Sequence, residues 1–150
     1  MIIKEAIDEK TFNDMVSLIV EHPYPEIDCR IDKYIEQLRN YHETDLGYKF
    51  FRSWVGYIDE VPVGYISGFR TLSPRSEIVV HDNYIRINYR SISNDKKLVK
   101  AIVDWSLETD TKRVSWTSNK SERLWKRFLK TMIKKDVKFK ELYFVSCEVA

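Results

Sequence analysis

Apolar residues recur at two different spacings in the first forty residues, which predicts a strand followed by two helices. The short apolar run of residues 2–6 favours a strand. Asp8 follows it with a side chain suited to a helix cap, and apolar residues then recur at helical spacing as far as Val20. Pro23 and Pro25 interrupt this helix. A second helix is predicted from near Ile27, with an apolar face of Ile27, Ile31, Tyr34, Ile35 and Leu38.

The middle of the chain changes to the spacing of strands. Residues 54–70 form two β-rich runs on either side of a polar pair, Asp59 and Glu60, which is typical of a β-hairpin. Pro62 stands at the start of the second run, where a strand tolerates proline. A long strand is then predicted from Ile78 to Tyr89. Its alternation places Ile85, Ile87 and Tyr89 on one face and Arg86 and Asn88 on the other.

The last third of the chain predicts helix, strand, helix and strand. The first of these helices has an apolar stripe that runs from Leu98 to Trp105. A strand over 113–119, an amphipathic helix over 121–135 and a final extended segment over 137–149 follow. The complete order is β-α-α-β-β-β-α-β-α-β. This order predicts an α/β (α+β) fold, in which a mixed sheet carries helices on its faces.

Composition narrows the class of protein. A length of 150 residues favours one domain, spanning 1–150, and 43% hydrophobic with 32% charged residues is a globular composition. The net charge of +2, without clustered Lys and Arg, argues against nucleic-acid binding. No apolar run is long enough to span a membrane, and the N-terminal segment lacks the features of a signal peptide. We expect a soluble, intracellular, cytoplasmic protein in which Cys29 and Cys147 are reduced thiols.

The segment Tyr89–Val99 joins the long strand to the next helix and has the layout of a phosphate-binding turn. Backbone N–H groups at a helix start, together with the helix dipole, favour phosphate. Such turns usually contain glycine, and this one has none. The alternative is an ordinary connection in which Ser93 or Asp95 caps the helix.

Three anchors around this segment resemble the GNAT acetyltransferase superfamily. The central strand of the family ends V-x-P-x-Tyr-Arg, and residues 85–90 match its aliphatic residue, tyrosine and arginine but not its proline. The loop pattern Arg/Gln-x-x-Gly-x-Gly/Ala followed by Leu falls on Arg90, with Ser93 and Asp95 at the small positions and Leu98 at the leucine. Further on, Asn119, Ser121 and Trp125 stand at the family's asparagine, small residue and tyrosine.

The resemblance implies a GNAT-like, mostly antiparallel central sheet flanked by helices, and acetyl-CoA as co-substrate. A carboxylate at Asp95 opposes phosphate: at about 5 Å and an effective dielectric of about 20, one charge pair costs roughly 3 kcal/mol. Arg90, Lys96 and Lys97 can offset this cost. The residues that the resemblance assigns to the co-substrate are Ile85, Arg86, Ile87, Arg90, Ser91, Ile92, Ser93, Asn94, Asp95, Lys96 and Asn119.

Transfer to an amine needs a general base, and the candidates near the central strand are Glu77, His81 and Asp82. The alternative is that the run His81-Asp82-Asn83 is only a polar turn or bulge. Trp125 stands at the position of the family tyrosine that protonates the leaving thiolate, but an indole N–H only donates a hydrogen bond. Tyr89 or a water would then act as the acid. The histidines have no metal-ligand spacing, and no metal site is predicted.

Two functional hypotheses follow from the resemblance. The first is an acyl-CoA-dependent N-acyltransferase that moves an acetyl group to an amine acceptor by direct attack, without a covalent enzyme intermediate. The second is a degenerate GNAT-fold binding or structural module, for example a phage accessory or virion-associated protein, that no longer uses acetyl-CoA. A homodimer or a protein partner is compatible with either hypothesis.

Overall fold

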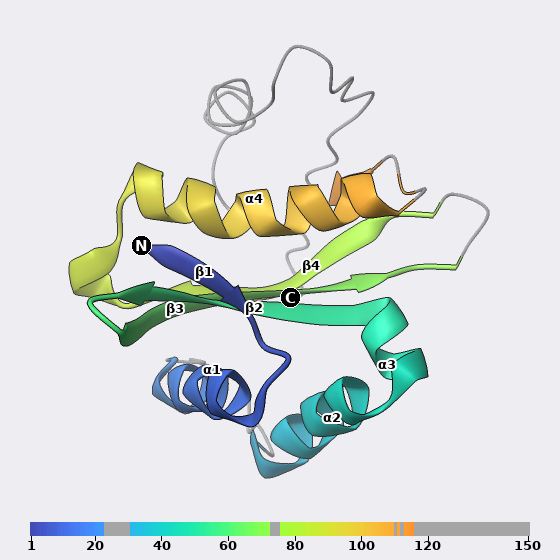
Figure 1. Cartoon of the computed structure of the whole chain (residues 1–150), viewed down its shortest axis with the longest axis horizontal. Coiled ribbons are helices and arrows are strands. Elements are labelled where there is room, and N and C mark those ends of the chain that lie inside the picture. Colours follow the sequence, from blue (N-terminus) through green and yellow to red (C-terminus); the bar gives the residue numbers. More distant parts are fainter. Residues whose placement is uncertain (23–30, 73–75, 110, 112, 116–150) are drawn as a thin grey trace, which may run out of the picture.

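A computed structural model describes residues 1–22, 31–72, 76–109, 111 and 113–115 (Figure 1). The predicted helix over 121–135, the predicted strand over 137–149 and the end of the strand over 113–119 lie outside the described residues. The elements are β1 (Ile2–Glu5), α1 (Glu9–Glu21), α2 (Ile31–Glu43), α3 (Asp45–Phe50), β2 (Phe51–Ile58), β3 (Val61–Arg70), β4 (Ile78–Ile85), a 3-10 turn η1 (Ile87–Tyr89), α4 (Ile92–Glu108) and β5 (Val114–Ser115).

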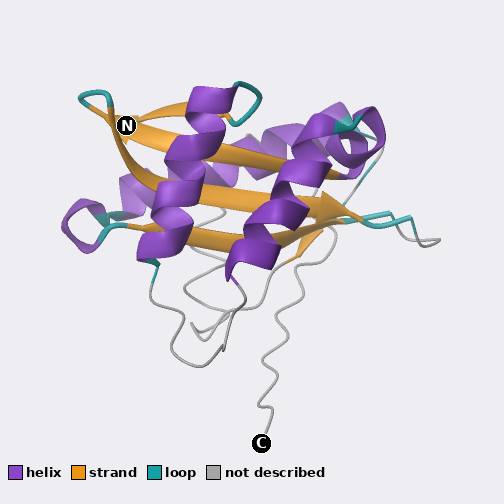
Figure 2. Cartoon of the chain, turned by 90° about the horizontal axis from the view of Figure 1, so that it is seen from below, coloured by secondary structure: helices purple, strands orange, loops and turns teal. Residues whose placement is uncertain are grey.

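The described strands form one sheet in the order β1-β2-β3-β4-β5. Neighbours are antiparallel except for β4 and β5, which run parallel. Helix α4 covers one face of the sheet, and α1 and α2 lie across the other (Figures 1 and 2). The predicted mixed, mostly antiparallel sheet flanked by helices is confirmed. Within the part of the chain that the structure describes, no helix is long and apolar enough to cross a membrane.

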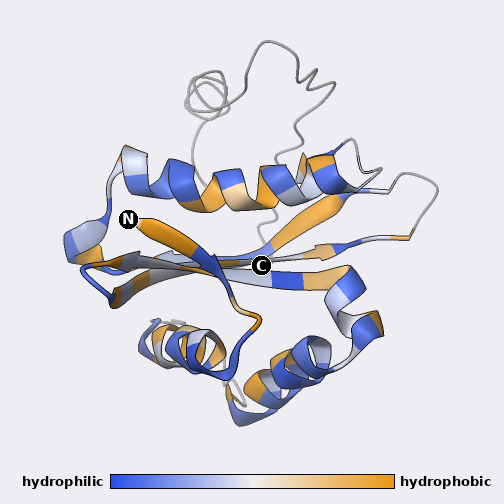
Figure 3. Ribbon diagram, in the orientation of Figure 1, coloured by the Kyte–Doolittle hydropathy of each residue, from blue (hydrophilic) through white to orange (hydrophobic). Residues whose placement is uncertain are grey.

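Each face of the sheet has its own apolar core. Apolar and polar residues alternate in colour along the helices that cover the sheet (Figure 3). Under α4, Trp54 and Ile66 of the sheet pack against Ile102 and Trp105 of the helix. On the α1 face the core holds Phe12, Met15, Leu18, Ile19, Leu38, Phe51, Val55, Tyr57, Tyr65 and Tyr84. The alternation of residues along β2 and β3 supplies both cores, because successive side chains of a strand point to opposite faces.

The helix boundaries follow local capping. Asp8 caps α1 as predicted, and its carboxylate accepts the N–H of Thr11 at 2.9 Å. The short helix α3 was not predicted from the sequence. It begins at a second cap, Thr44, whose hydroxyl accepts the N–H of Gly47 at 3.0 Å. Six residues are too few to show a helical apolar period, so only the capping threonine marks this helix in the sequence.

The predicted hairpin is confirmed, although β2 begins at Phe51 rather than Trp54. Asp59 and Glu60 form its two-residue turn with φ values of 48° and 62°. Positive φ at both central residues gives the turn a twist that matches the flanking strands. Glu60 is an unusual residue there, because glycine or asparagine is commoner at such positions.

Gly64 lets β3 and β4 approach closely. A Cβ at this position would lie 2.7 Å from the carbonyl oxygen of Tyr84 and 2.9 Å from a side-chain carbon of Ile85. We expect Gly64→Ala to lower the free energy of unfolding by about 2 kcal/mol, because the backbone of β4 must shift to admit the methyl group. Urea unfolding measures the change, with the exposed Val61→Ala as the control. An unchanged midpoint would show that the strands can separate without cost.

The prediction of a long strand over 78–89 is wrong at its C-terminal end. β4 stops at Ile85, and residues 87–89 form η1. The N–H of Arg86 makes the last bond to β3, at Val63 O. The next β3 residue in register is Pro62, which has no N–H to donate, and its carbonyl accepts a hydrogen bond from the Arg86 guanidinium. Beyond this point the chain turns, and the N–H of Tyr89 bonds to Arg86 O. Ile87, predicted to share a face with Ile85, is 74% exposed, whereas Ile85 is buried.

Candidate functional site

A bulge interrupts β4 where the candidate bases lie. Asp82 pairs with Ser67 of β3, but the next pair joins Gly68 to Val80. His81 is therefore an extra residue in β4. Bulges of this kind redirect side chains and are frequent beside active sites. Here the contacts of His81 and Asp82 show that both side chains lie on the α1 and α2 face of the sheet.

Asp82 belongs to a polar cluster with Tyr65 and His22. The buried Tyr65 hydroxyl donates to Asp82 Oδ2. His22 Nδ1 lies 3.3 Å from the Tyr65 hydroxyl and 3.8 Å from Asp82 Oδ1. The cluster joins the end of α1 to the middle of β3 and β4, and it places a carboxylate beside two groups that can hold or pass a proton.

The end of α1 fixes the position of His22. Its backbone N–H closes the helix by bonding to Leu18 O and Ile19 O, at 2.9 and 3.2 Å. Its ring stacks on that of Tyr84, with centroids 4.7 Å apart and an interplanar angle of 23°. The imidazole is thus held against β4 from two sides.

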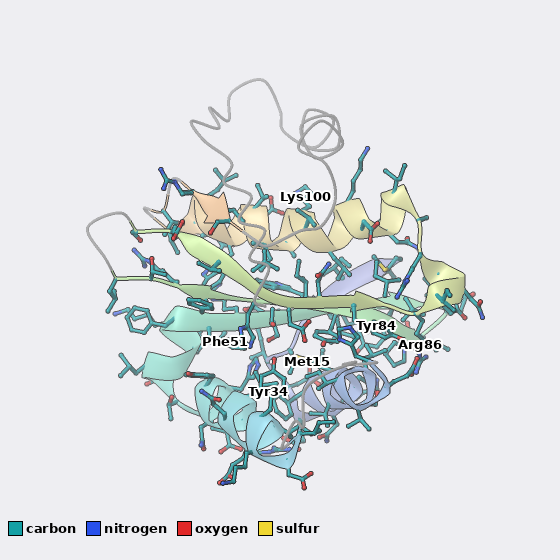
Figure 4. All side chains as sticks on the ribbon, turned by 180° about the vertical axis from the view of Figure 1, so that it is seen from behind. Met15, Tyr34, Phe51, Tyr84, Arg86 and Lys100 are labelled. Atoms are coloured by element: carbon teal, nitrogen blue, oxygen red, sulfur yellow. The ribbon has the colours of Figure 1, made fainter. Side chains whose placement is uncertain are left out.

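Arg86 forms a second polar group at the same end of the sheet as Tyr84 (Figure 4). Its guanidinium donates to both carboxylate oxygens of Glu21, at 2.7 to 2.9 Å, and to Pro62 O at 2.8 Å. The hydrogen bond from Arg86 lowers the pKa of Glu21, and burial followed by the neighbouring Glu21 raises the pKa of Tyr84. This ion pair ties α1 to the end of β4. A role for the Arg86 side chain toward a co-substrate stays a prediction.

The segment predicted to bind phosphate is largely the first turn of α4. Ser91 is the cap, and its hydroxyl accepts the N–H of Asn94 at 3.1 Å. The alternative prediction of a cap at Ser93 or Asp95 is wrong, because α4 begins two residues earlier than that pattern assumed. The N–H of Asp95 bonds to Ser91 O at 2.9 Å, as in a regular helix.

Two side chains of this connection donate hydrogen bonds to its own backbone carbonyl groups. Arg90 Nε donates to Ile85 O at 2.9 Å, and Asn94 Nδ2 donates to Tyr89 O at 2.7 Å. The groups that could meet an anion here are the N–H groups of the first turn of α4 and the side chains of Arg90 and Lys96. Asp95 lies in that same first turn and opposes them.

The structure brings only part of the predicted site together. Ser91 to Lys96 share the start of α4, while Ile85 lies in the core beneath it. Glu77 precedes β4 and accepts a hydrogen bond from the Ser115 hydroxyl at 3.2 Å, so it stands apart from the Asp82 cluster. Trp125 and Asn119 lie outside the described residues.

The sequence did not single out His22 or Tyr65 as site residues. By its sequence context, Tyr65 is an ordinary strand residue and His22 is a residue that precedes a proline. Only the packing of α1 across β3 and β4 brings them to Asp82. In the described ranges, no group of three His, Cys, Asp or Glu side chains is placed to hold a metal ion.

A hollow of about 440 Å³ lies on the other face of the sheet, between β1, β2 and α4. Its charged residues are largely paired with one another: Arg52 contacts Glu108 at 3.2 Å and Glu5 at 3.8 Å, and Lys100 pairs with Asp104. The hollow lies away from the Asp82 cluster, with the sheet between them.

Comparison with solved structures identifies proteins that share this fold. No protein-family model matches the sequence, and a search of curated proteins finds no significant match. Solved structures do match. One is aminoglycoside 6'-N-acetyltransferase AAC(6')-IG from Acinetobacter haemolyticus, in the apo form, with TM-score 0.65, 10% identity, and 98% of this chain and 99% of that one covered.

Two further matches were solved with a co-substrate or an analogue. AAC(6')-Iy in complex with the bisubstrate analogue CoA-S-monomethyl-acetylneamine gives TM-score 0.66 at 10% identity, covering 97% and 98% of the two chains. A predicted acetyltransferase with acetyl-CoA from Clostridium acetobutylicum gives 0.63 at 14% identity, covering 96% and 95%. The chain therefore has the GNAT acetyltransferase fold, as the resemblance predicts.

Proposed function

We propose that this chain is an N-acetyltransferase that moves an acetyl group from acetyl-CoA directly to a primary amine. The observation that carries the proposal is the Asp82 carboxylate, which follows the bulge in β4 and accepts a hydrogen bond from Tyr65. Proteins of the same fold have been solved with acetyl-CoA or a CoA bisubstrate analogue, which supports acetyl-CoA as the co-substrate. The predicted cytoplasmic location and homodimer stay predictions.

Asp82 acts in this proposal as the general base. The acceptor nitrogen attacks the thioester carbon, and a proton passes from the nitrogen to the Asp82 carboxylate. The carbon–sulfur bond breaks as the carbon–nitrogen bond forms, and the leaving thiolate takes a proton from Tyr89 or from water. Tyr65 orients Asp82 by its hydrogen bond, and His22 Nδ1 lies beside both groups.

The start of α4 is the proposed site for the pyrophosphate of acetyl-CoA. A helix of 17 residues directs the positive end of its dipole and its first N–H groups toward an anion. Arg90 and Lys96 add positive charge, and Asp95 opposes it. Among the described residues, β5 pairs with β4 only at Ile78 and Val79. This short pairing is compatible with a co-substrate lying along the remainder of β4.

A second candidate function is the degenerate binding or structural module. The hydrogen bonds that the loop before α4 makes within itself favour it. Arg90 and Asn94 use side-chain donors on carbonyl groups of the connection itself, and Asp95 occupies the turn where an anion would lie. A loop satisfied by its own hydrogen bonds folds without a ligand. Such a module would act through a protein partner.

Calorimetric titration with acetyl-CoA separates the two candidates. We expect the wild-type chain to bind acetyl-CoA with micromolar affinity and Asp95→Asn to bind about a hundredfold more tightly, because the variant removes one repulsive charge pair of roughly 3 kcal/mol. Asp104→Asn on the same helix is the matched control and should bind like the wild type. If millimolar acetyl-CoA produces no heat with either the wild type or Asp95→Asn, the acetyltransferase proposal fails and the module is favoured.

A further inference from the structure

Four aromatic side chains gather beside the bulge in β4, and we name them the His81 ring cluster: Tyr34, Phe51, Phe69 and His81. The ring centroid of His81 lies 5.8 Å from that of Tyr34, 6.0 Å from that of Phe51 and 6.0 Å from that of Phe69. Phe51 and Phe69 are neighbours in the pairing of β2 with β3, and Tyr34 comes from α2. Figure 4 shows Phe51 and Tyr84 toward opposite ends of this side of the sheet.

The His81 ring cluster presents rings at the surface. His81 is exposed, Phe69 is 36% exposed and Tyr34 is half-buried, whereas Phe51 is buried beneath them. A bulge can turn a side chain in the middle of a sheet outward, where a ligand can reach it. Rings grouped in this way offer π faces and edges to another aromatic ring, and they attract the cation of an amine.

The charges nearby do not suit a molecule that carries several ammonium groups. Such a polycation is held by several carboxylates without cationic partners. Two carboxylates near the cluster already have partners: Asp82 accepts a hydrogen bond from Tyr65, and Glu21 pairs with Arg86. One amine can approach Asp82, which directly follows His81 in the chain. The surface that the His81 ring cluster itself offers to the acceptor is aromatic.

We propose that the His81 ring cluster is the acceptor subsite and that it selects an amine carried on an aromatic ring. The ring lies against Tyr34, His81 and Phe69, and the nitrogen points toward Asp82. This inference rests on the proposed acetyltransferase function. It goes beyond that function by assigning the class of acceptor and the residues that select it.

Binding of two amines to the full chain tests the inference without requiring turnover. Tryptamine is the aromatic probe and spermidine the polycationic one, and both are titrated by calorimetry and by NMR of the histidine ring protons. We expect tryptamine to bind at least tenfold more tightly than spermidine and to shift the ring protons of His81. Phe69→Ala and Tyr34→Leu should each weaken tryptamine about tenfold, while Ile2→Ala, exposed on β1, should leave binding unchanged.

Three results would overturn the inference: equal or tighter binding of spermidine, tryptamine binding that leaves His81 unshifted, or unchanged affinity in both ring variants when thermal unfolding shows that they are folded. The acetyl-CoA titration is a separate measurement. Tryptamine at His81 without acetyl-CoA binding would refute the acetyltransferase and with it the acceptor role. Acetyl-CoA binding with preference for spermidine would refute the aromatic acceptor alone.

Discussion

Asp82→Asn should lower the rate of acetyl transfer by between 100-fold and 10,000-fold. The substitution keeps an oxygen that can accept the hydrogen bond from Tyr65, so the cluster holds its shape. It removes the group that takes the proton from the acceptor nitrogen, and general-base catalysis is worth about this factor. Release of the CoA thiol, followed with a thiol reagent and tryptamine as acceptor, measures the change.

Two variants make this result specific. Tyr65→Phe removes the hydrogen bond to Asp82 but keeps the carboxylate, and we expect a smaller loss of about tenfold. Asp104→Asn changes a carboxylate on the opposite face of the sheet and should retain the full rate. An Asp82→Asn protein that folds normally and acetylates within threefold of the wild-type rate would exclude Asp82 as the base.

The wild-type chain should lose about 2 kcal/mol of stability between pH 7.5 and pH 5 through His42 alone. Its imidazole packs edge-on against Phe12 and Phe51, with centroids 5.1 and 6.1 Å away. Its Nε2 is buried and has no hydrogen-bond partner in the part of the chain that the structure describes. Burial lowers the pKa of His42 from 6.5 to about 4.

The direction of the effect follows from which state binds the proton. Between pH 6.5 and about pH 4, the unfolded chain protonates His42 and the folded chain does not. The stabilising contribution of neutral His42 is therefore complete above pH 6.5 and is lost as the pH falls toward 4. The loss approaches roughly 3 kcal/mol at the low end, since each unit of pKa difference corresponds to about 1.4 kcal/mol.

Urea unfolding at pH 7.5 and pH 5 isolates this contribution. His42→Phe keeps an aromatic ring between Phe12 and Phe51, and it should lose about 2 kcal/mol less than the wild type over that interval. His81→Gln is the matched control, because it removes an exposed imidazole. If His42→Phe and the wild type lose the same stability, the ring is hydrated in solution and its burial has no energetic effect.

Local signals in the sequence predicted local structure well. The Asp8 cap and the two-residue turn at Asp59 and Glu60 depend on neighbouring residues, and the structure has both. The end of β4 depends instead on Pro62 of the neighbouring strand, which has no N–H to donate, and an alternating pattern through Tyr89 carries no information about that partner. The cap of α4 was placed wrongly for a related reason, because Ser91, Ser93 and Asp95 are all plausible caps in isolation.

The candidate site was predictable only in part. Asp82 was chosen for its place near a central strand, and the structure places it directly after a bulge, which is the alternative that the polar run His81-Asp82-Asn83 indicates. His22 and Tyr65 join it through packing between elements far apart in the chain. Proximity of this kind follows from the tertiary fold, and a single sequence contains no direct signal for it.

The topology of the sheet also sets the order in which the molecule can assemble. β2, β3 and β4 follow one another in the chain and pair with their sequence neighbours, whereas β1 pairs with β2 across the three helices between them, for example Ile2 with Tyr57. Closing that long loop costs more entropy than closing the hairpin. During folding, the outer edge of β2 therefore stays open until β1 arrives, and an unpaired edge can join another chain. The short strand β1 thus protects the growing sheet from aggregation.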